Sequence, residues 1–239
     1  MKTKKHSAGY YIGFLIFIIV ALINIYPMAF SIFCSFKGNL EIFSSFTALP
    51  KKLRIENYLT AWNVGNIGRY FLNTIILAVG TLAISCLFGA MASYVLAKFK
   101  FRGKSKIYLL FISGMMIPIQ AVLIPLSYIF GKLGIMNNYP VLILLYAAFC
   151  FPMTILILTG FMNGIPTELE EAMVIDGANI YQVFFKMILP LSVPGIVSVS
   201  IFNFIQVWNN LLFPLIFISD KDKGCLLYTS PSPRDYAAS

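Results

Sequence analysis

Long uncharged apolar tracts alternate with short charged segments along the whole chain. A helix needs about 20 apolar residues to cross a bilayer, and in lipid it must satisfy its backbone groups internally. The pattern therefore predicts an all-α fold, a polytopic transmembrane helical bundle. We expect five spans, at about residues 12–36, 70–97, 107–131, 139–162 and 193–218. Pro118 and Pro125 break up the third span, and Pro152 lies inside the fourth.

Basic residues gather at the ends of these tracts. Charged residues make up only 11% of the chain, and the formal net charge is +9. Lys2, Lys4 and Lys5 precede the first tract, and the densest basic loop, from Lys98 to Lys106, follows the second. The positive-inside rule accounts for this placement, so we assign the charge to topology and expect no nucleic-acid partner. It predicts a cytoplasmic N-terminus, and the first apolar tract exceeds the roughly 7–15 residues of a cleaved signal peptide.

The segment from Lys37 to Arg69 mixes charges, Pro50 and aromatic residues, and we place it on the outer side of the membrane. Within it, Glu56 to Trp62 fits a short interfacial helix, because Trp and Tyr prefer the headgroup level. An ordinary loop is an equal alternative.

Residues 164–190 form the long polar interruption in the second half of the chain. Thr167 and Glu170 have the spacing of a capping box, which predicts a helix from Thr167 to Ile175. Glu168, Glu170 and Glu171 would lie near its N-terminus, where each exposed carboxylate contributes about 0.3–1 kcal/mol. A solvated acidic loop between two spans is the alternative.

Asp176-Gly177-Ala178 predicts a turn after this helix, because Asp-Gly favours turns and Gly tolerates positive φ. A second, amphipathic helix should follow. Its apolar stripe runs at i, i+3, i+4, i+7 and i+8 until Leu189-Pro190 stops or kinks it, and it comprises Ile180, Val183, Phe184, Met187 and Ile188.

Three amides in the last predicted span, Asn203, Gln206 and Asn210, follow one line along a helix. Such groups are costly in a membrane unless they are partnered or face water. They are candidates to line a substrate path and to bind sugar hydroxyls. Polar contacts between helices are the alternative.

The loop from 164 to 190 resembles the EAA motif of ABC importer permeases. Glu171-Ala172-Met173, Gly177, Met187 and Leu189-Pro190 keep its spacing, with Met at two positions where the family has Ala and Ile. The resemblance implies a MetI-like fold and a coupling helix that docks into a cytoplasmic ATPase. The docking residues it implies are Glu168, Glu170, Glu171, Ala172, Asp176, Gly177 and Ala178.

The chain is also similar to the MalG-like branch of carbohydrate permeases along most of Glu56 to Ile218. Matching segments include Lys98 to Gly103, Met116-Ile117-Pro118 and Trp208-Asn209-Asn210, although the family often has an acidic residue where Asn210 stands. This resemblance implies a multi-pass protein of the bacterial plasma (inner) membrane. It also implies a sugar substrate and three kinds of partner: a MalF-like second permease, two copies of an ABC ATPase and a solute-binding protein outside the cell.

The sequence gives no sign of an active site. Gly103-Lys104-Ser105 resembles the end of a P-loop but lacks the Gly five residues before it. One His, no paired carboxylates in a span and no metal-ligand spacing argue against an enzyme, and we expect no cofactor or metal. A secondary transporter or channel for a small polar solute is the alternative function, but it predicts ionisable residues within the spans.

The last residues, 225–239, differ abruptly from the rest of the chain. Cys225 to Asp235 resembles an in-frame translation of a transposon-based sequencing adapter. We therefore expect residues 225–239 to be non-native, with a sixth span of the family truncated near Gly224.

Overall fold

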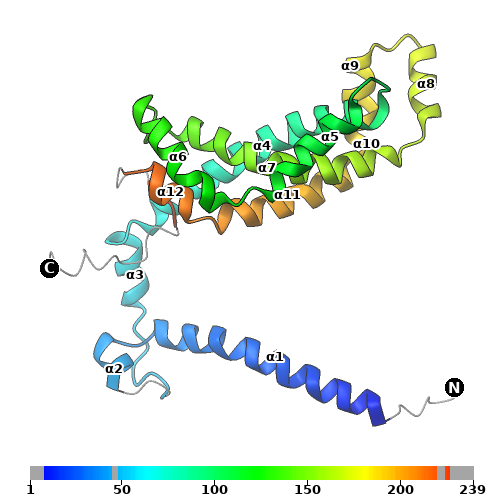
Figure 1. Cartoon of the computed structure of the whole chain (residues 1–239). Helices are drawn as coiled ribbons and strands as arrows, with labels where there is room; N and C mark the ends of the chain where they lie inside the picture. Colours follow the sequence, from blue (N-terminus) through cyan, green and yellow to red (C-terminus); the bar gives the residue numbers. More distant parts are fainter. Residues whose placement is uncertain (1–7, 45–47, 220–223, 227–239) are drawn as a thin grey trace. The chain divides into compact units, whose positions relative to one another are not determined.

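A computed structural model describes residues 8–44, 48–219 and 224–226, and these residues are mostly helical and contain no strand. The expected all-helical architecture is therefore confirmed. The chain divides into two compact units, Met1–Asn66 and Ile67–Ser239 (Figure 1). Most of the tail predicted to be non-native, from residue 227 on, lies outside the described residues.

The first unit contains one long apolar helix and two short ones. α1 spans Ala8–Ser35, α2 spans Asn39–Ser44 and α3 spans Glu56–Asn63, where the interfacial helix was predicted. The α3 residue Asn57 donates from Nδ2 to the carbonyls of Ser35, at 2.8 Å, and Lys37, at 2.9 Å. This amide therefore ties α3 to the turn that ends α1.

The second unit contains the remaining helices. Two are long, and the others are shorter pieces joined by bends or turns. They are α4 (Ile67–Lys98), α5 (Lys104–Ser113), η1 (Gly114–Met116), α6 (Ile119–Lys132), α7 (Tyr139–Asn163), α8 (Thr167–Ile175), α9 (Ile180–Val183), the π-helix η2 (Phe184–Ile188), α10 (Leu189–Leu191), α11 (Val193–Trp208) and α12 (Leu212–Phe217).

The core of this unit lies where α4, α7 and α11 pack together. Leu77, Leu142 and Phe213 are buried toward one end, and Leu158 and Ile188 are buried toward the other. Figure 1 shows α6 and α12 at the first end and α8 and α9 at the second. The packing thus leaves α8 at the tip of the bundle, outside its core.

Two predicted spans are not continuous helices. The expected break at Pro118 is present, and the helices on its two sides meet at 94°, whereas Pro125 lies inside α6 without ending it. The expectation of one helix over 193–218 is wrong, because α11 ends at Trp208 and α12 begins at Leu212. By length and composition three described helices could cross a membrane, or up to five if each bent pair is one span.

Candidate docking surface

α8 begins at Thr167, but the predicted capping box is absent. Thr167 is the first helical residue, Pro166 takes the cap position, and no side chain caps the helix. Glu170 turns instead toward α4, where its Oε1 lies 2.9 Å from the Lys98 ammonium. The prediction was wrong because a partly buried cation competes for this carboxylate more strongly than a backbone N–H at the helix start.

A complete capping box occurs one helix later, at a place where we did not expect it. The Asn179 side chain accepts from the Gln182 N–H at 2.9 Å, and the Gln182 side chain accepts from the Asn179 N–H at 2.8 Å. The spacing Asn-x-x-Gln just before an apolar stripe was the available signal. This box fixes where α9 starts.

The turn between α8 and α9 is a Schellman motif, which confirms the predicted break. The Ala178 N–H donates to the Met173 carbonyl at 2.9 Å, and the Gly177 N–H donates to the Val174 carbonyl at 3.0 Å. Gly177 has φ +82°, and a Cβ there would meet nothing within 4 Å. Glycine is therefore favoured here by backbone conformation and not by lack of space.

We define the docking surface by a set of exposed residues of α8 and its turn. They are Glu168, Glu171, Ala172, Val174, Ile175, Asp176 and Gly177. Sequence reasoning missed Val174, which is 59% exposed, and Ile175, which is 85% exposed. Their place beside the acidic residues, outside any apolar tract, was the signal. The surface thus combines carboxylates with exposed apolar groups, a composition suited to protein contact.

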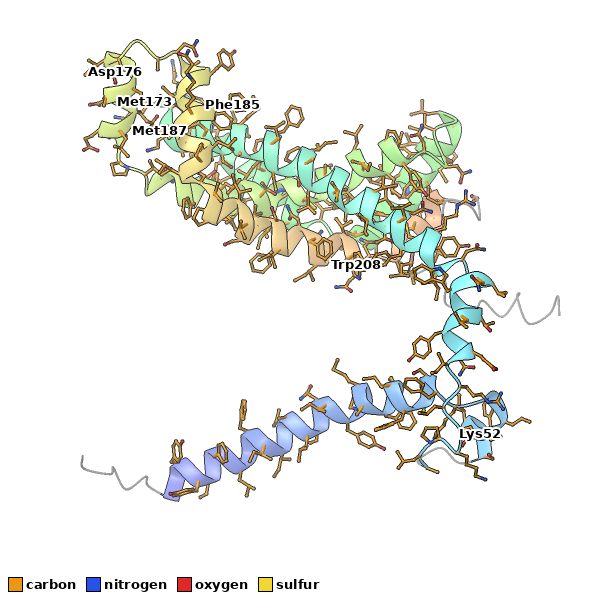
Figure 2. All side chains as sticks on the ribbon, turned by 180° about the vertical axis from the view of Figure 1, so that it is seen from behind. Lys52, Met173, Asp176, Phe185, Met187 and Trp208 are labelled. Carbon is orange, nitrogen blue, oxygen red and sulfur yellow. The ribbon has the colours of Figure 1, made fainter. Side chains whose placement is uncertain are left out.

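The other predicted docking residues face the protein to different degrees. Glu170 has a side chain only 16% exposed, and Ala178 is half-buried. Met173, which replaces the family's Ala, packs with Ala178 against the buried cluster formed by α4, α7, α9 and η2. Figure 2 shows Met173 and Met187 at the same end of the second unit, with Asp176 nearby. The Met173 side chain therefore helps to anchor α8 to the bundle.

The predicted apolar stripe after the turn is largely buried. Val183, Phe184 and Ile188 are buried and Met187 is half-buried, whereas Ile180 is 46% exposed. The run does not stop at Pro190, because α10 continues to Leu191. The bend of 71° falls at the next residue, Ser192. The buried stripe therefore packs α9 and η2, the second helical part of the loop, against the core.

The three amides predicted to form one polar line do not all lie on one helix. Asn203 is fully buried on α11, and its Nδ2 donates to Thr154 Oγ1 at 2.9 Å. Gln206 is half-buried on the same helix. Asn210 lies beyond the end of α11, and its side chain accepts from the Phe213 N–H at 3.2 Å. The predicted line is therefore wrong for Asn210, because α11 ends before it. The contacts of Asn203 are those of the inter-helix alternative.

These features define a class, a helical membrane subunit that presents an acidic helix and turn at the tip of its bundle. Residues 85–239 match the family model described as "Binding-protein-dependent transport system inner membrane component", and the chain belongs to this family. It is a multi-pass inner-membrane permease component of an ABC transporter.

Relatives of known kind cover most of the chain. It is 41% identical over 209 residues to a diacetylchitobiose uptake system permease protein of Streptomyces coelicolor, covering 87% of this chain and 69% of the relative. It is 34% identical to a probable starch degradation products transport system permease protein of Thermoanaerobacterium thermosulfurigenes, covering 90% and 78%. These relatives are transport permeases and not enzymes.

A solved structure shares the fold. The crystal structure of a bacterial ABC transporter involved in the import of the acidic polysaccharide alginate matches with a TM-score of 0.84 and 21% sequence identity. The match covers 99% of this chain and 87% of the other. The MetI-like fold is therefore confirmed.

Proposed function

We propose that this chain is a membrane-spanning subunit of a sugar or oligosaccharide importer, and that its docking surface seats in a cleft of a separate ATPase. The observation that carries the docking role is the Schellman turn. It holds Glu171 and Ala172 on an exposed helix, with Ala178 and Met173 packed on the core. Closure of the ATPase would move this unit and switch the bundle between inward and outward access.

The sugar substrate is inferred from the relatives, whose names specify diacetylchitobiose and starch degradation products. The same family relation supports three kinds of partner around this chain. We infer a second, MalF-like permease, two copies of the ATPase and an extracellular or periplasmic solute-binding protein. We further infer that ATP hydrolysis belongs entirely to the ATPase copies.

The orientation follows from two loops at one end of the bundle. Lys98, where the basic loop begins, donates to the carbonyl of Ile165 and pairs with Glu170. The basic loop and the acidic loop therefore lie on the same side of the membrane. Because the positive-inside rule assigns the basic loop to the cytoplasm, we infer that α8 faces the cytoplasm. The same rule, applied to Lys2, Lys4 and Lys5, supports a cytoplasmic N-terminus.

Uptake by the assembled transporter in vesicles tests the docking role. We expect Glu171→Lys to abolish ATP-dependent uptake and to release the ATPase during purification, with membrane insertion intact. The vesicles would be offered maltose, maltotriose, diacetylchitobiose and arabinotriose, and we expect uptake of at least one by the unsubstituted protein. Import of none of them would refute the sugar assignment.

A second pair of variants tests the turn. We expect Gly177→Asp to abolish uptake, because it places a negative charge at a helix C-terminus and a side chain at positive φ. Gly177→Asn is the matched control, since it has the same size without the charge and Asn adopts this conformation more readily. Normal uptake with Glu171→Lys and Gly177→Asp would contradict the docking role.

A further inference from the structure

Two side chains at the cytoplasmic end of α4 hold α8 through its one half-buried carboxylate. Lys98, the last residue of α4, lies 2.9 Å from Glu170 Oε1, at ion-pair distance though without the alignment of a hydrogen bond. The Tyr94 hydroxyl, one turn earlier, donates to Glu170 Oε2 at 3.2 Å. Both carboxylate oxygens of Glu170 are therefore engaged by α4.

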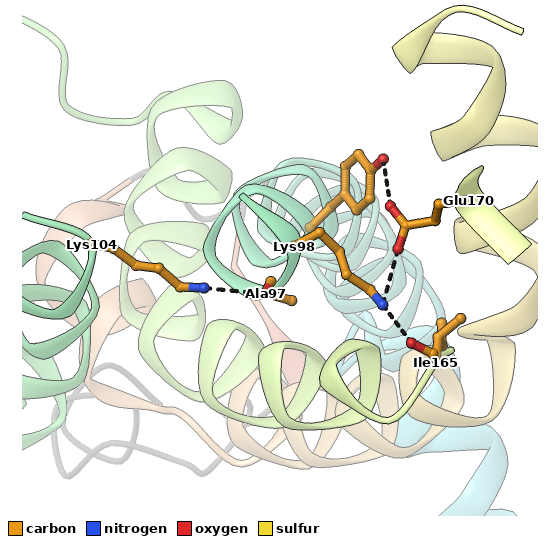
Figure 3. A network of polar contacts seen from close by, with 6 residues as sticks. Ala97, Lys98, Lys104, Ile165 and Glu170 are labelled. Carbon is orange, nitrogen blue, oxygen red and sulfur yellow. Dashed lines mark hydrogen bonds and ion pairs between the residues drawn. The ribbon is translucent and has the colours of Figure 1, made fainter. Parts of the chain in front are cut away.

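Lys98 also holds the segment just before α8. Its ammonium donates to the carbonyl of Ile165, two residues ahead of the helix (Figure 3). The side chains of Lys98 and Glu170 are only 6% and 16% exposed. Charges that are this far removed from water interact more strongly than exposed pairs, and they are costly to separate once one partner is withdrawn.

The neighbouring charges do not share this arrangement. Glu168 and Glu171 on α8 are exposed, and so is Lys100, two residues after Lys98. Lys104 donates to the carbonyl of Ala97 at 3.1 Å and so stays on the α4 side of the network (Figure 3). Glu170 therefore faces the bundle, whereas Glu168 and Glu171 are directed to solvent.

We propose that Tyr94, Lys98 and Glu170 form a coupling clamp, which makes α8 and the end of α4 move as one body. The inference rests on the proposed docking of α8. Along the chain, α8 joins the core on one side through residues 164–166, which follow α7 directly, and on the other side through the turn at Gly177. Neither connection leads to α4. The clamp adds a direct side-chain connection to α4, the helix that packs along α7 and contacts α11. Displacement of α8 by the ATPase is thereby passed to α4 without first passing through the turn.

Distance measurement in the assembled transporter tests the clamp without any sugar. Spin labels at Leu169 and Val95, which are 44% and 43% exposed, report the separation of α8 and α4. We expect the same narrow distance distribution in the nucleotide-free and the ATP-bound complex. In Lys98→Gln we expect the distribution to broaden and to change with nucleotide. A distance that changes with ATP in the unsubstituted complex would overturn the clamp.

Transport provides the functional test. We expect Lys98→Gln and Glu170→Gln each to lower uptake of the imported panel sugar at least tenfold, with the ATPase still copurifying and hydrolysing ATP. Lys100→Gln, the exposed neighbour, should transport normally, and Lys98→Arg, which keeps the charge, should retain at least half of the uptake. Uptake by the variant that carries both Lys98→Gln and Glu170→Gln should be no lower than uptake by the less active single variant, because both changes break the same interaction.

The outcomes separate the clamp from the docking role. Loss of the ATPase from Lys98→Gln would assign these residues to docking and overturn the clamp, as would Lys98→Arg being as inactive as Lys98→Gln. Independent, additive losses in the double variant would also overturn it. Failure of docking itself would show instead as ATPase retained and uptake normal in Glu171→Lys.

Discussion

The tip and the core of the second unit are built on different principles. At the tip, short-range motifs fix the backbone: a Schellman turn at Gly177 and a capping box between Asn179 and Gln182. In the core, contacts between residues far apart in sequence decide the packing, as where Asn203 of α11 reaches Thr154 of α7.

This difference matches the two roles proposed for the tip and for the core. A docking element must keep its shape while its surface stays exposed, so local hydrogen bonds suit it. The stability of the core, in contrast, depends on close contacts between its helices. We therefore expect substitutions at the tip to damage coupling more than folding, and substitutions in the core to damage folding first.

The largest effect on stability is expected at Gly89 of α4. A Cβ there would overlap with Cγ2 of Thr154, and Thr154 is a β-branched residue whose hydroxyl donates to the Cys150 carbonyl. Because the neighbour cannot turn away easily, Gly89→Ala should destabilise the protein by about 1–3 kcal/mol, the usual cost of overpacking. Thermal unfolding in detergent would measure this.

Gly160 of α7 is the matched control for this change. It also lies inside a long helix, but a Cβ there would meet nothing within 4 Å. Gly160→Ala should therefore be neutral or stabilising, by about 0.4–1 kcal/mol. Equal unfolding temperatures for the two variants would show that α4 and α7 do not pack as closely as described.

The tip was more predictable from sequence than the core, for physical reasons. The turn at Gly177 follows from a dipeptide with a strong local preference, and the buried stripe through Val183 and Ile188 follows from helical periodicity. The prediction of a capping box at Thr167 was wrong because its partner, Glu170, pairs instead with Lys98, 72 positions away along the chain. No local pattern encodes such a contact.

The wrong prediction of one continuous helix over 193–218, in the core, has a similar origin. The apolar run over 193–218 has no strong helix breaker at Asn209 or Asn210, yet α11 ends at Trp208. The Asn210 side chain accepts from the Phe213 N–H, and its carbonyl accepts from the Tyr146 hydroxyl of α7. The break is thus stabilised partly by a tertiary contact that periodicity alone cannot show.

A moderate effect is expected at the turn itself. Gly177→Ala places a Cβ at φ +82°, which costs about 1–2 kcal/mol for an L-residue. Because an exposed turn can relieve this strain by opening locally while the bundle stays folded, we expect ATP-dependent uptake to fall several-fold, with the unfolding temperature of the bundle changing little. A shift in unfolding temperature as large as that of Gly89→Ala would contradict the division between tip and core.

The smallest effect on stability is expected at Asn203, where the two readings of the buried amide can be separated. Asn203→Leu removes the hydrogen bonds that its amide donates to Thr154, at 2.9 Å, and to Ser85, at 3.5 Å. The Thr154 hydroxyl keeps its bond to the Cys150 carbonyl and the Ser85 hydroxyl keeps its bond to the Leu82 carbonyl, so neither hydroxyl loses its only partner. Hydrogen bonds between membrane helices contribute about 0.6 kcal/mol on average, and the unfolding temperature should fall only slightly. If the amide serves packing, uptake per folded molecule stays unchanged in Asn203→Leu. If it lines the substrate path, uptake per folded molecule falls sharply while stability hardly changes, so measuring both quantities on one preparation decides between the two roles.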